Sequence, residues 1–295
     1  MEYEASFIIP AFNEELRIRG LLGALTDPAL TGQCAIFVVC NGCTDKTMEV
    51  AQEYEDVTVV EIQDVGKHFA LNEGDRHAGD IFPRFYCDAD FQIDAESIIQ
   101  MIDFLSVEDT IVGGHHATFD CAHRPWSVQR FYEARATLPF LANWFDANLV
   151  GRAVYRMSRR ARSQFGKFPR LRADDAFFYA QFENSEKSEI PGAAVAISTP
   201  QSLRELIHNE VRVFKGNREL DAYLSEQDHE SSRIVRDDVP VVRKLLRGIN
   251  VVRVWLRGID ISSYPTFDVY ISIVIAIWVN LEIVERLQVS KVLLV

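Results

Sequence analysis

The sequence lacks the residues that several broad classes of protein depend on. Its 295 residues include only five cysteines, an odd number, and we expect no secretory leader at the first residues, which favours free thiols in a reducing compartment. Cys40 and Cys43 form a lone CxxC, without the second cysteine or histidine pair that a zinc site needs. We therefore interpret this pair as a core thiol and a loop residue.

Basic residues and long apolar runs are also scarce. The chain has 31 Lys and Arg against 43 Asp and Glu, a net charge of −12, whereas a protein that wraps nucleic acid needs a broad cationic field. We expect no nucleic-acid partner. The uncharged run Val269–Leu281 is much shorter than the about 20 residues that cross a bilayer, so it is a weak transmembrane candidate.

Short apolar runs alternate with helical patterns along the chain. We predict strands at Ser6–Pro10, Ala35–Cys40, Val57–Ile62, Phe82–Cys87, Thr110–Gly113, Ala153–Met157 and Ala193–Ser198. We predict helices at Glu14–Leu25, Thr44–Tyr54, Lys67–His77, Ala95–Leu105, Val128–Asn143, Asp175–Phe182 and Ser202–Leu224. This alternation predicts an α/β fold with a mostly parallel, Rossmann-like central sheet flanked by helices.

Polar residues follow three of the predicted strands, at residues 10–14, 41–45 and 88–90. Ligands of parallel sheets bind outside the carboxyl ends of the strands, so these segments are expected to line one site. Asp88 and Asp90 stand one residue apart, and such a pair can bind one hard divalent cation, Mg²⁺ or Mn²⁺. A pair of solvated turn aspartates is the alternative for this short motif alone.

Four segments in this order carry a family resemblance: IIPAFNEE (8–15), VVCNGCTDKT (38–47), GKHFALNEG (66–74) and YCDAD (86–90). Together they resemble the family-2 glycosyltransferases with the GT-A fold, and the resemblance extends over residues 5–220. It implies an enzyme of the hexosyltransferase type that moves a sugar, with inversion, from a nucleotide-diphosphate sugar to an acceptor hydroxyl.

The resemblance also implies a donor site and a metal site. The implied donor-binding residues of the first half are Pro10, Ala11, Asn13, Glu14, Asn41, Asp45, Lys67, Asp88 and Ala89. Asp90 would be the main ligand of a divalent metal and Asp88 would assist it, while Lys67 would lie near the donor phosphates. Asn13 and Asp45 could also simply start helices. Cys43 stands where the family more often has serine, which leaves the contacts to the base in doubt.

An acidic pair and a cationic stretch complete the implied site. Asp174-Asp175 occupies the place of the family's general base; alignment of the pair selects Asp175, and a one-residue slip selects Asp174. The alternative is an acidic helix N-terminus. Arg212 and Lys215 would lie over the donor diphosphate, or on a solvated basic face. For His115 and His116, acceptor contact, plain surface and metal ligation all stay open.

We expect a GT-A domain over residues 1–228, with a nucleotide-sugar half at 1–114 and an acceptor half at 115–228. Residues 229–295 would form a helical appendage. Its segment 239–259 has five Lys or Arg and no acid, which favours either a membrane surface or packing on the catalytic domain or a second subunit. We expect a cytoplasmic protein, or one at the inner face of the membrane, with a carbohydrate or lipid-linked acceptor.

Two alternative functions are a sugar nucleotidyltransferase and a non-catalytic sugar-nucleotide-binding protein. A sugar nucleotidyltransferase shares such sheets, but it normally has a Gly-rich, Arg- or Lys-bearing loop after the first strand, where this chain reads PAFNEE. A non-catalytic sugar-nucleotide-binding protein would lack the metal carboxylates or the base, and both acidic pairs are present here.

Overall fold

The structure is a computed structural model that describes residues 3–103, 112–137 and 153–227. The chain divides into two compact units, each described here by itself. Unit 1 comprises Met1–Thr118 and Asn148–Ile197, and unit 2 comprises Phe119–Ala147 and Ser198–Val295. The predicted domain boundaries stay a prediction, since the appendage at 229–295 lies outside the described residues.

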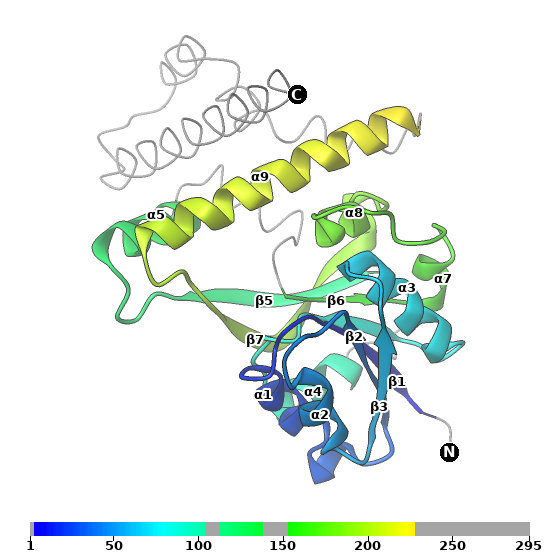
Figure 1. The fold of residues 1–295 in the computed structure, drawn as a ribbon. Helices are drawn as coiled ribbons and strands as arrows, with labels where there is room; N and C mark the ends of the chain where they lie inside the picture. Colours follow the sequence, from blue (N-terminus) through cyan, green and yellow to red (C-terminus); the bar gives the residue numbers. More distant parts are fainter. Residues whose placement is uncertain (1–2, 104–111, 138–152, 228–295) are drawn as a thin grey trace, which may run out of the picture. The chain divides into compact units, whose positions relative to one another are not determined.

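Seven strands in the described part of the chain form one sheet in the order β3-β2-β1-β4-β6-β5-β7 (Figure 1). They are β1 (Ala5–Ala11), β2 (Cys34–Asn41), β3 (Val57–Ile62), β4 (Arg84–Cys87), β5 (Val112–Asp120), β6 (Val154–Met157) and β7 (Lys187–Ser198). Strands β1 to β4 pair in parallel, whereas β6 runs antiparallel to both β4 and β5. The predicted α/β fold is confirmed.

Helices cover both faces of the parallel half of the sheet. Those of unit 1 are α1 (Ile18–Leu25), α2 (Thr47–Gln52), α3 (Lys67–Ala78), α4 (Ala95–Asp103), α7 (Arg159–Arg162) and α8 (Asp174–Tyr179), with 3-10 turns η1 (Pro28–Leu30) and η3 (Asn184–Glu186). Helices α1, α2 and α4 share one apolar core with alternate residues of β1 and β2. Helix α3 packs on the opposite face (Figure 1).

The packing of α3 on β1 is especially close. A Cβ atom added at Gly74 would overlap the side chain of Ile8, so only glycine lets the helix approach the strand this closely. On the other face, the rings of Phe7 and Phe85 stack with centroids 4.6 Å apart. These contacts fix β1, β4 and α3 as one rigid body, and all three carry residues of the predicted site near their ends.

Unit 2 contains α5 (Trp126–Thr137) and α9 (Leu203–Glu226). Its described contacts include the rings of Phe119 and Tyr132, 4.7 Å apart, and a hydrogen bond from Arg124 Nε to Thr199 Oγ1 of 3.2 Å. No helix within the described ranges is both long and apolar enough to span a membrane.

Several predicted elements differ at their ends, and the largest differences concern α1, β5 and β7, the last of which begins at Lys187 rather than at the predicted Ala193. Helix α1 begins at Ile18 rather than Glu14, and the backbone N–H groups of residues 14 and 15 donate to the side chains of Thr47 and Asp45. Strand β5 extends to Asp120, well beyond the predicted end at Gly113. The sequence pattern does not predict this extension, because the Gly-Gly and His-His pairs give little sign of a strand.

Candidate active site

The loops that follow β1 and β2 are joined by side-chain hydrogen bonds. Thr47 Oγ1 accepts from the backbone N–H of Glu14 at 2.7 Å, and Asp45 Oδ2 accepts from that of Glu15 at 3.1 Å. Asp45 also accepts from the hydroxyl of Thr47; although burial opposes it, this bonding holds the pKa of Asp45 below its usual range. Asp45 is thus a charged anchor between the loops.

Asn13 makes a second connection between the same loops. Its Oδ1 atom accepts from the backbone N–H of Thr44 at 2.8 Å, and its φ of 57° is in the left-handed region that asparagine tolerates. Cys43 donates its S–H to the carbonyl oxygen of Ala11 at 3.3 Å, so the thiol does take part in the turn. Phe12, between Ala11 and Asn13, leaves 47% of its surface exposed at this edge.

Asn41 is buried and uses both ends of its amide inside the protein. Its Nδ2 donates to the carbonyl oxygen of Ala11 at 2.8 Å, and its Oδ1 accepts from the backbone N–H of Gly66 at 3.2 Å. The side chain therefore fixes the ends of β1 and β2 and the start of α3 relative to one another. Its predicted contact with the base stays a prediction.

The carboxylates of Glu14, Asp88 and Asp90 interact electrostatically at this edge of the sheet. Burial first, and then the charge of Asp90, raises the pKa of Glu14; burial and the charge of Asp88 raise the pKa of Asp90. Arg17 Nη1 lies 3.5 Å from Glu14 and 3.9 Å from Asp90. Mutual repulsion among acids is the electrostatic situation that a bound cation relieves.

Lys67, the first residue of α3, links this acidic group to the acidic pair. Its Nζ lies 2.6 Å from Asp88 Oδ1 and 2.9 Å from Asp174 Oδ2. Burial alone would lower the pKa of Lys67, but the negative charges of Asp174 and Asp88 outweigh it and raise the pKa above its usual value. Lys67 is therefore a permanent cation between the two predicted halves of the site.

The two members of the acidic pair have different surroundings. Asp174, the first residue of α8, is 8% exposed and accepts from the Tyr155 hydroxyl at 3.1 Å besides Lys67. Burial raises the pKa of Asp174, and Lys67 opposes that effect. Asp175 is more exposed, and its Oδ1 accepts from the backbone N–H of Ala176 at 2.8 Å. Asp174, the buried member, is the poorer candidate for contact with an acceptor.

The donor set at this edge suits a hard divalent cation. Within the described ranges, no three His, Cys, Asp or Glu side chains are arranged to hold a metal ion by themselves. Asp88 and Asp90 would supply two carboxylate oxygens to the cation. The rest of its coordination shell would be left to oxygens of a bound substrate, as is common for Mg²⁺ and Mn²⁺.

The remaining predicted residues are placed as follows. Pro10, Ala11 and Ala89 are buried, and their predicted contacts with a donor stay predictions. Arg212 and Lys215 lie on α9 in unit 2, and their role at the donor stays a prediction. His115 and His116 belong to β5, and their side chains are outside the described set.

Three residues of this region were missed by sequence reasoning: Arg17, Thr47 and Tyr155. Arg17 lies one helical turn beyond Glu14, and that spacing could have indicated it. Thr47 is the last residue of the segment 38–47 that carries the family resemblance, so a role for its hydroxyl could have been inferred. Tyr155 reaches Asp174 only through the antiparallel β6, and nothing local in the sequence predicts this pairing.

Comparison with known proteins supports the fold. No curated protein matches the chain in sequence. The solved structures it resembles include the mannosyltransferase PcManGT from Pyrobaculum calidifontis with GDP-Man and Mn²⁺, at 16% identity and a TM-score of 0.64, covering 95% of this chain and 87% of that one.

Two further solved structures are similar. Staphylococcus aureus TarS 1–349 with UDP-GlcNAc has 15% identity and a TM-score of 0.52, covering 98% of this chain and 92% of that one. Glucosyl-3-phosphoglycerate synthase from Mycobacterium tuberculosis, with Mn²⁺, UDP and glucosyl-3-phosphoglycerate, has 16% identity and a TM-score of 0.53, covering 75% and 78%. At these identities the likeness establishes the GT-A fold.

The family assignment comes from sequence. The pattern of the family described as Glycosyl transferase family 2 matches residues 6–169, more than half of the 295-residue chain. The match includes β1 to β4, both loops joined by Asn13 and Asp45, and the Asp88-Ala89-Asp90 motif. The chain therefore belongs to glycosyl transferase family 2.

Proposed function

We propose that this protein is an inverting, metal-dependent glycosyltransferase of the hexosyltransferase type, which transfers a sugar from a nucleotide-diphosphate sugar to an acceptor hydroxyl. The observation that carries the proposal is the chain of contacts from Asp88 through Lys67 to Asp174. It brings a donor-side carboxylate and the acidic pair into one site.

The donor side would be formed by the carboxyl ends of β1, β2 and β4. Phe12 offers an exposed aromatic surface for a nucleobase to stack on, and Glu14 offers a carboxylate for ribose hydroxyls. Asp90 and Asp88 would hold Mn²⁺ or Mg²⁺. The cation, when bound, supplies positive charge that neutralises the diphosphate. The presence of Mn²⁺ in similar structures supports this assignment.

The acceptor side would use Asp175 as the general base. In an inverting transfer the acceptor oxygen forms a bond to the anomeric carbon while the bond to the diphosphate oxygen breaks, and the hydroxyl proton passes to a carboxylate. Asp175 is the more exposed member of the pair, whereas Asp174 is held by Lys67 and Tyr155. Asp174 would therefore orient the pair, and Asp175 would take the proton.

The test is a transfer assay with a panel of nucleotide sugars, Mn²⁺ and carbohydrate or lipid-linked acceptors. Asp175→Asn keeps the shape of the side chain but cannot take a proton, so we expect unchanged donor affinity and a loss of transfer of about 10²-fold or more. Normal turnover by this variant would mean that the base is elsewhere. Pyrophosphate release from a nucleoside triphosphate would indicate a nucleotidyltransferase, and donor binding without transfer to any acceptor would indicate a non-catalytic binding protein.

A further inference from the structure

Helix α3 contacts residues 162–174, which lead up to the acidic pair and include its first member, at three points. Lys67 lies against Asp174, Asn72 against Phe168, and Asp75 against Arg162. At 3.6 residues per turn, positions 67, 72 and 75 fall within about 140° of arc, so they share one side of the helix. The segment 162–174 is therefore fastened along α3 and not only at its ends.

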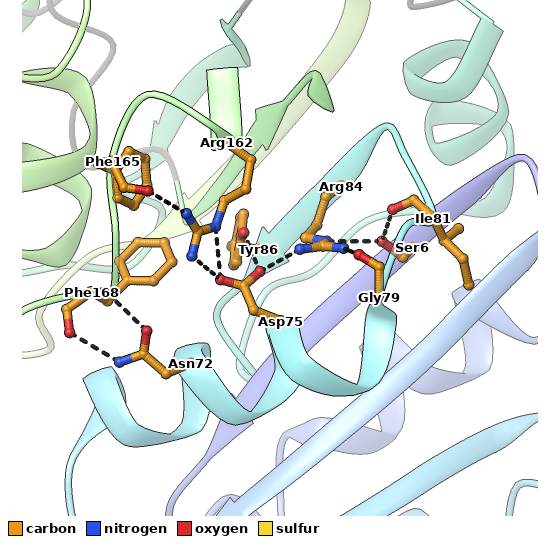
Figure 2. Close-up of polar contacts among 10 residues, drawn as sticks. All are labelled: Ser6, Asn72, Asp75, Gly79, Ile81, Arg84, Tyr86, Arg162, Phe165 and Phe168. Atoms are coloured by element: carbon orange, nitrogen blue, oxygen red, sulfur yellow. Dashed lines mark hydrogen bonds and ion pairs between the residues drawn. The ribbon is translucent and has the colours of Figure 1, made fainter. Parts of the chain in front are cut away.

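The middle contact is a reciprocal pair of hydrogen bonds to the backbone. Asn72 Nδ2 donates to the carbonyl oxygen of Phe168 at 3.0 Å, and Asn72 Oδ1 accepts from the N–H of Phe168 at 2.8 Å. Figure 2 shows the amide of Asn72 facing this residue from α3. Because both backbone groups of one residue are held by one planar side chain, the position and orientation of the loop at residue 168 are fixed.

The third contact is centred on the Asp75 carboxylate, whose side chain is 10% exposed. It accepts from Arg162 Nε at 2.8 Å, from Arg84 Nη1 at 2.6 Å and from the Tyr86 hydroxyl at 2.6 Å (Figure 2). Arg162 also donates through Nη1 to the carbonyl oxygen of Phe165 at 2.8 Å. The carboxylate thus ties α3, β4 and the start of the segment together through charge-assisted bonds.

An aromatic cluster connects the segment 162–174 to α8. The ring of Phe165 packs edge-on against those of Phe168 and Phe177, with centroids 5.3 and 5.5 Å apart. Phe177 lies in the first turn of α8, three residues after Asp174 and two after Asp175. The position of α8 therefore depends on the loop that Asn72 and Arg162 hold.

We propose that Asn72 and Arg162 are positioning residues, through which α3 sets the distance between Asp88 on the donor side and the acidic pair. This inference rests on the proposed function, because it assigns a purpose to a fixed separation between donor and base. A displacement of about 1 Å of a reacting group costs about 10²-fold in rate, so a contact remote from the chemistry can control it. Neither residue is expected to touch donor or acceptor.

The test compares the full-length wild type with Asn72→Ala, which removes both bonds to Phe168. We expect kcat to fall by about tenfold or more while the Kd of the nucleotide sugar in Mn²⁺ changes by less than about twofold, because Asp88 and Asp90 stay in place. Hydrogen–deuterium exchange should rise in residues 162–178 and stay unchanged in residues 84–91.

Two further variants separate positioning from general loss of stability. Arg162→Met leaves Asp75 bonded to Arg84 and Tyr86 and keeps an apolar side chain near Phe165, so it should reproduce the loss of kcat and the local rise in exchange. Arg76→Gln, one position beyond Asp75 on the exposed side of α3, should behave as the wild type. If Asn72→Ala does not fold, Arg162→Met decides the question.

Several outcomes would overturn the proposal. Wild-type kcat in a variant whose segment 162–178 exchanges faster would mean that the anchoring does not position the base. Unchanged exchange in that segment would mean that the contacts do not hold it. If donor binding weakened by the same factor as kcat fell, and exchange rose throughout α3, Asn72 and Arg162 would have only a structural role. If the wild type itself binds a donor but transfers nothing, the proposed function fails, while the exchange data still judge the anchoring.

Discussion

Single carboxylates at the donor side carry charges that depend on each other. Burial first, and then the charge of Asp88, makes the ionisation of Asp90 less favourable, and burial and the charge of Asp90 do the same for Glu14. Lys67 offsets part of this charge from one side, and Arg17 from the other. The site is therefore poised to gain from a further cation.

This arrangement gives a pH dependence with a definite sign. The pKa values of Glu14 and Asp90 lie above their usual values, so these groups take up protons at a higher pH than an ordinary carboxyl with a pKa of about 4. A proton competes with a metal ion for the same oxygen. We predict that the affinity for Mn²⁺ plus nucleotide sugar falls as the pH is lowered into the range of these raised pKa values, by up to about tenfold per pH unit below them.

Calorimetric titrations between pH 8 and 4.5 would measure this effect. Asp94→Asn is a suitable control, because hydrogen bonds from Ser97 hold the pKa of Asp94 below its usual range and it caps α4 rather than facing the acidic group. An affinity that stays constant down to pH 4.5 would contradict the account of the charges at residues 14 and 90.

Among the elements, α3 is central because it touches both predicted halves of the site. Its first residue bonds Asp88 and Asp174, its middle holds the loop before α8, and its fit on β1 depends on Gly74. The packing of α3 on β1 therefore affects the positions of all these residues of the site.

We predict opposite effects for two glycine-to-alanine changes in helices. Gly74→Ala would force α3 away from Ile8, and such overpacking costs about 1–3 kcal/mol of the free energy of unfolding. Gly23→Ala, in α1, meets no atom within 4 Å and replaces the flexible glycine in a helix, so it should stabilise the protein by up to about 1 kcal/mol. Urea denaturation of both variants measures the difference. Equal stability of the two would mean that α3 is not tightly seated.

Sequence reasoning predicted the elements of the parallel half well, because short apolar strands there alternate with amphipathic helices. It could not predict that β6 inserts antiparallel beside β4, since strand order and direction depend on contacts remote in sequence. For the same reason it could not predict that Lys67, which the family resemblance places near the donor phosphates, lies between Asp88 and Asp174. Its predicted phosphate contact stays untested.

The donor-side loops show a different limit. By sequence alone Asn13 and Asp45 fit either ligands or helix caps, and in the structure each also joins one loop to the other. Such bonds link residues about 30 positions apart, and a single sequence carries no signal of which side chain will meet which backbone group. The motif residues were identifiable; their partners were not.

At the scale of the whole molecule, a chain with a net charge of −12 is proposed to bind a negatively charged nucleotide diphosphate. A divalent cation resolves this conflict locally, without a broad cationic surface. The account therefore requires that donor binding depend on the metal, and that this dependence pass through Asp90.

The most direct measurement is isothermal calorimetry of the full-length wild type and Asp90→Ala with nucleotide-diphosphate sugars, with and without Mn²⁺. The account predicts that the wild type binds at least one donor only when Mn²⁺ is present, and that Asp90→Ala, with unchanged thermal stability, loses this binding. Donor binding that is equally tight without the metal, or that survives in Asp90→Ala, would contradict it.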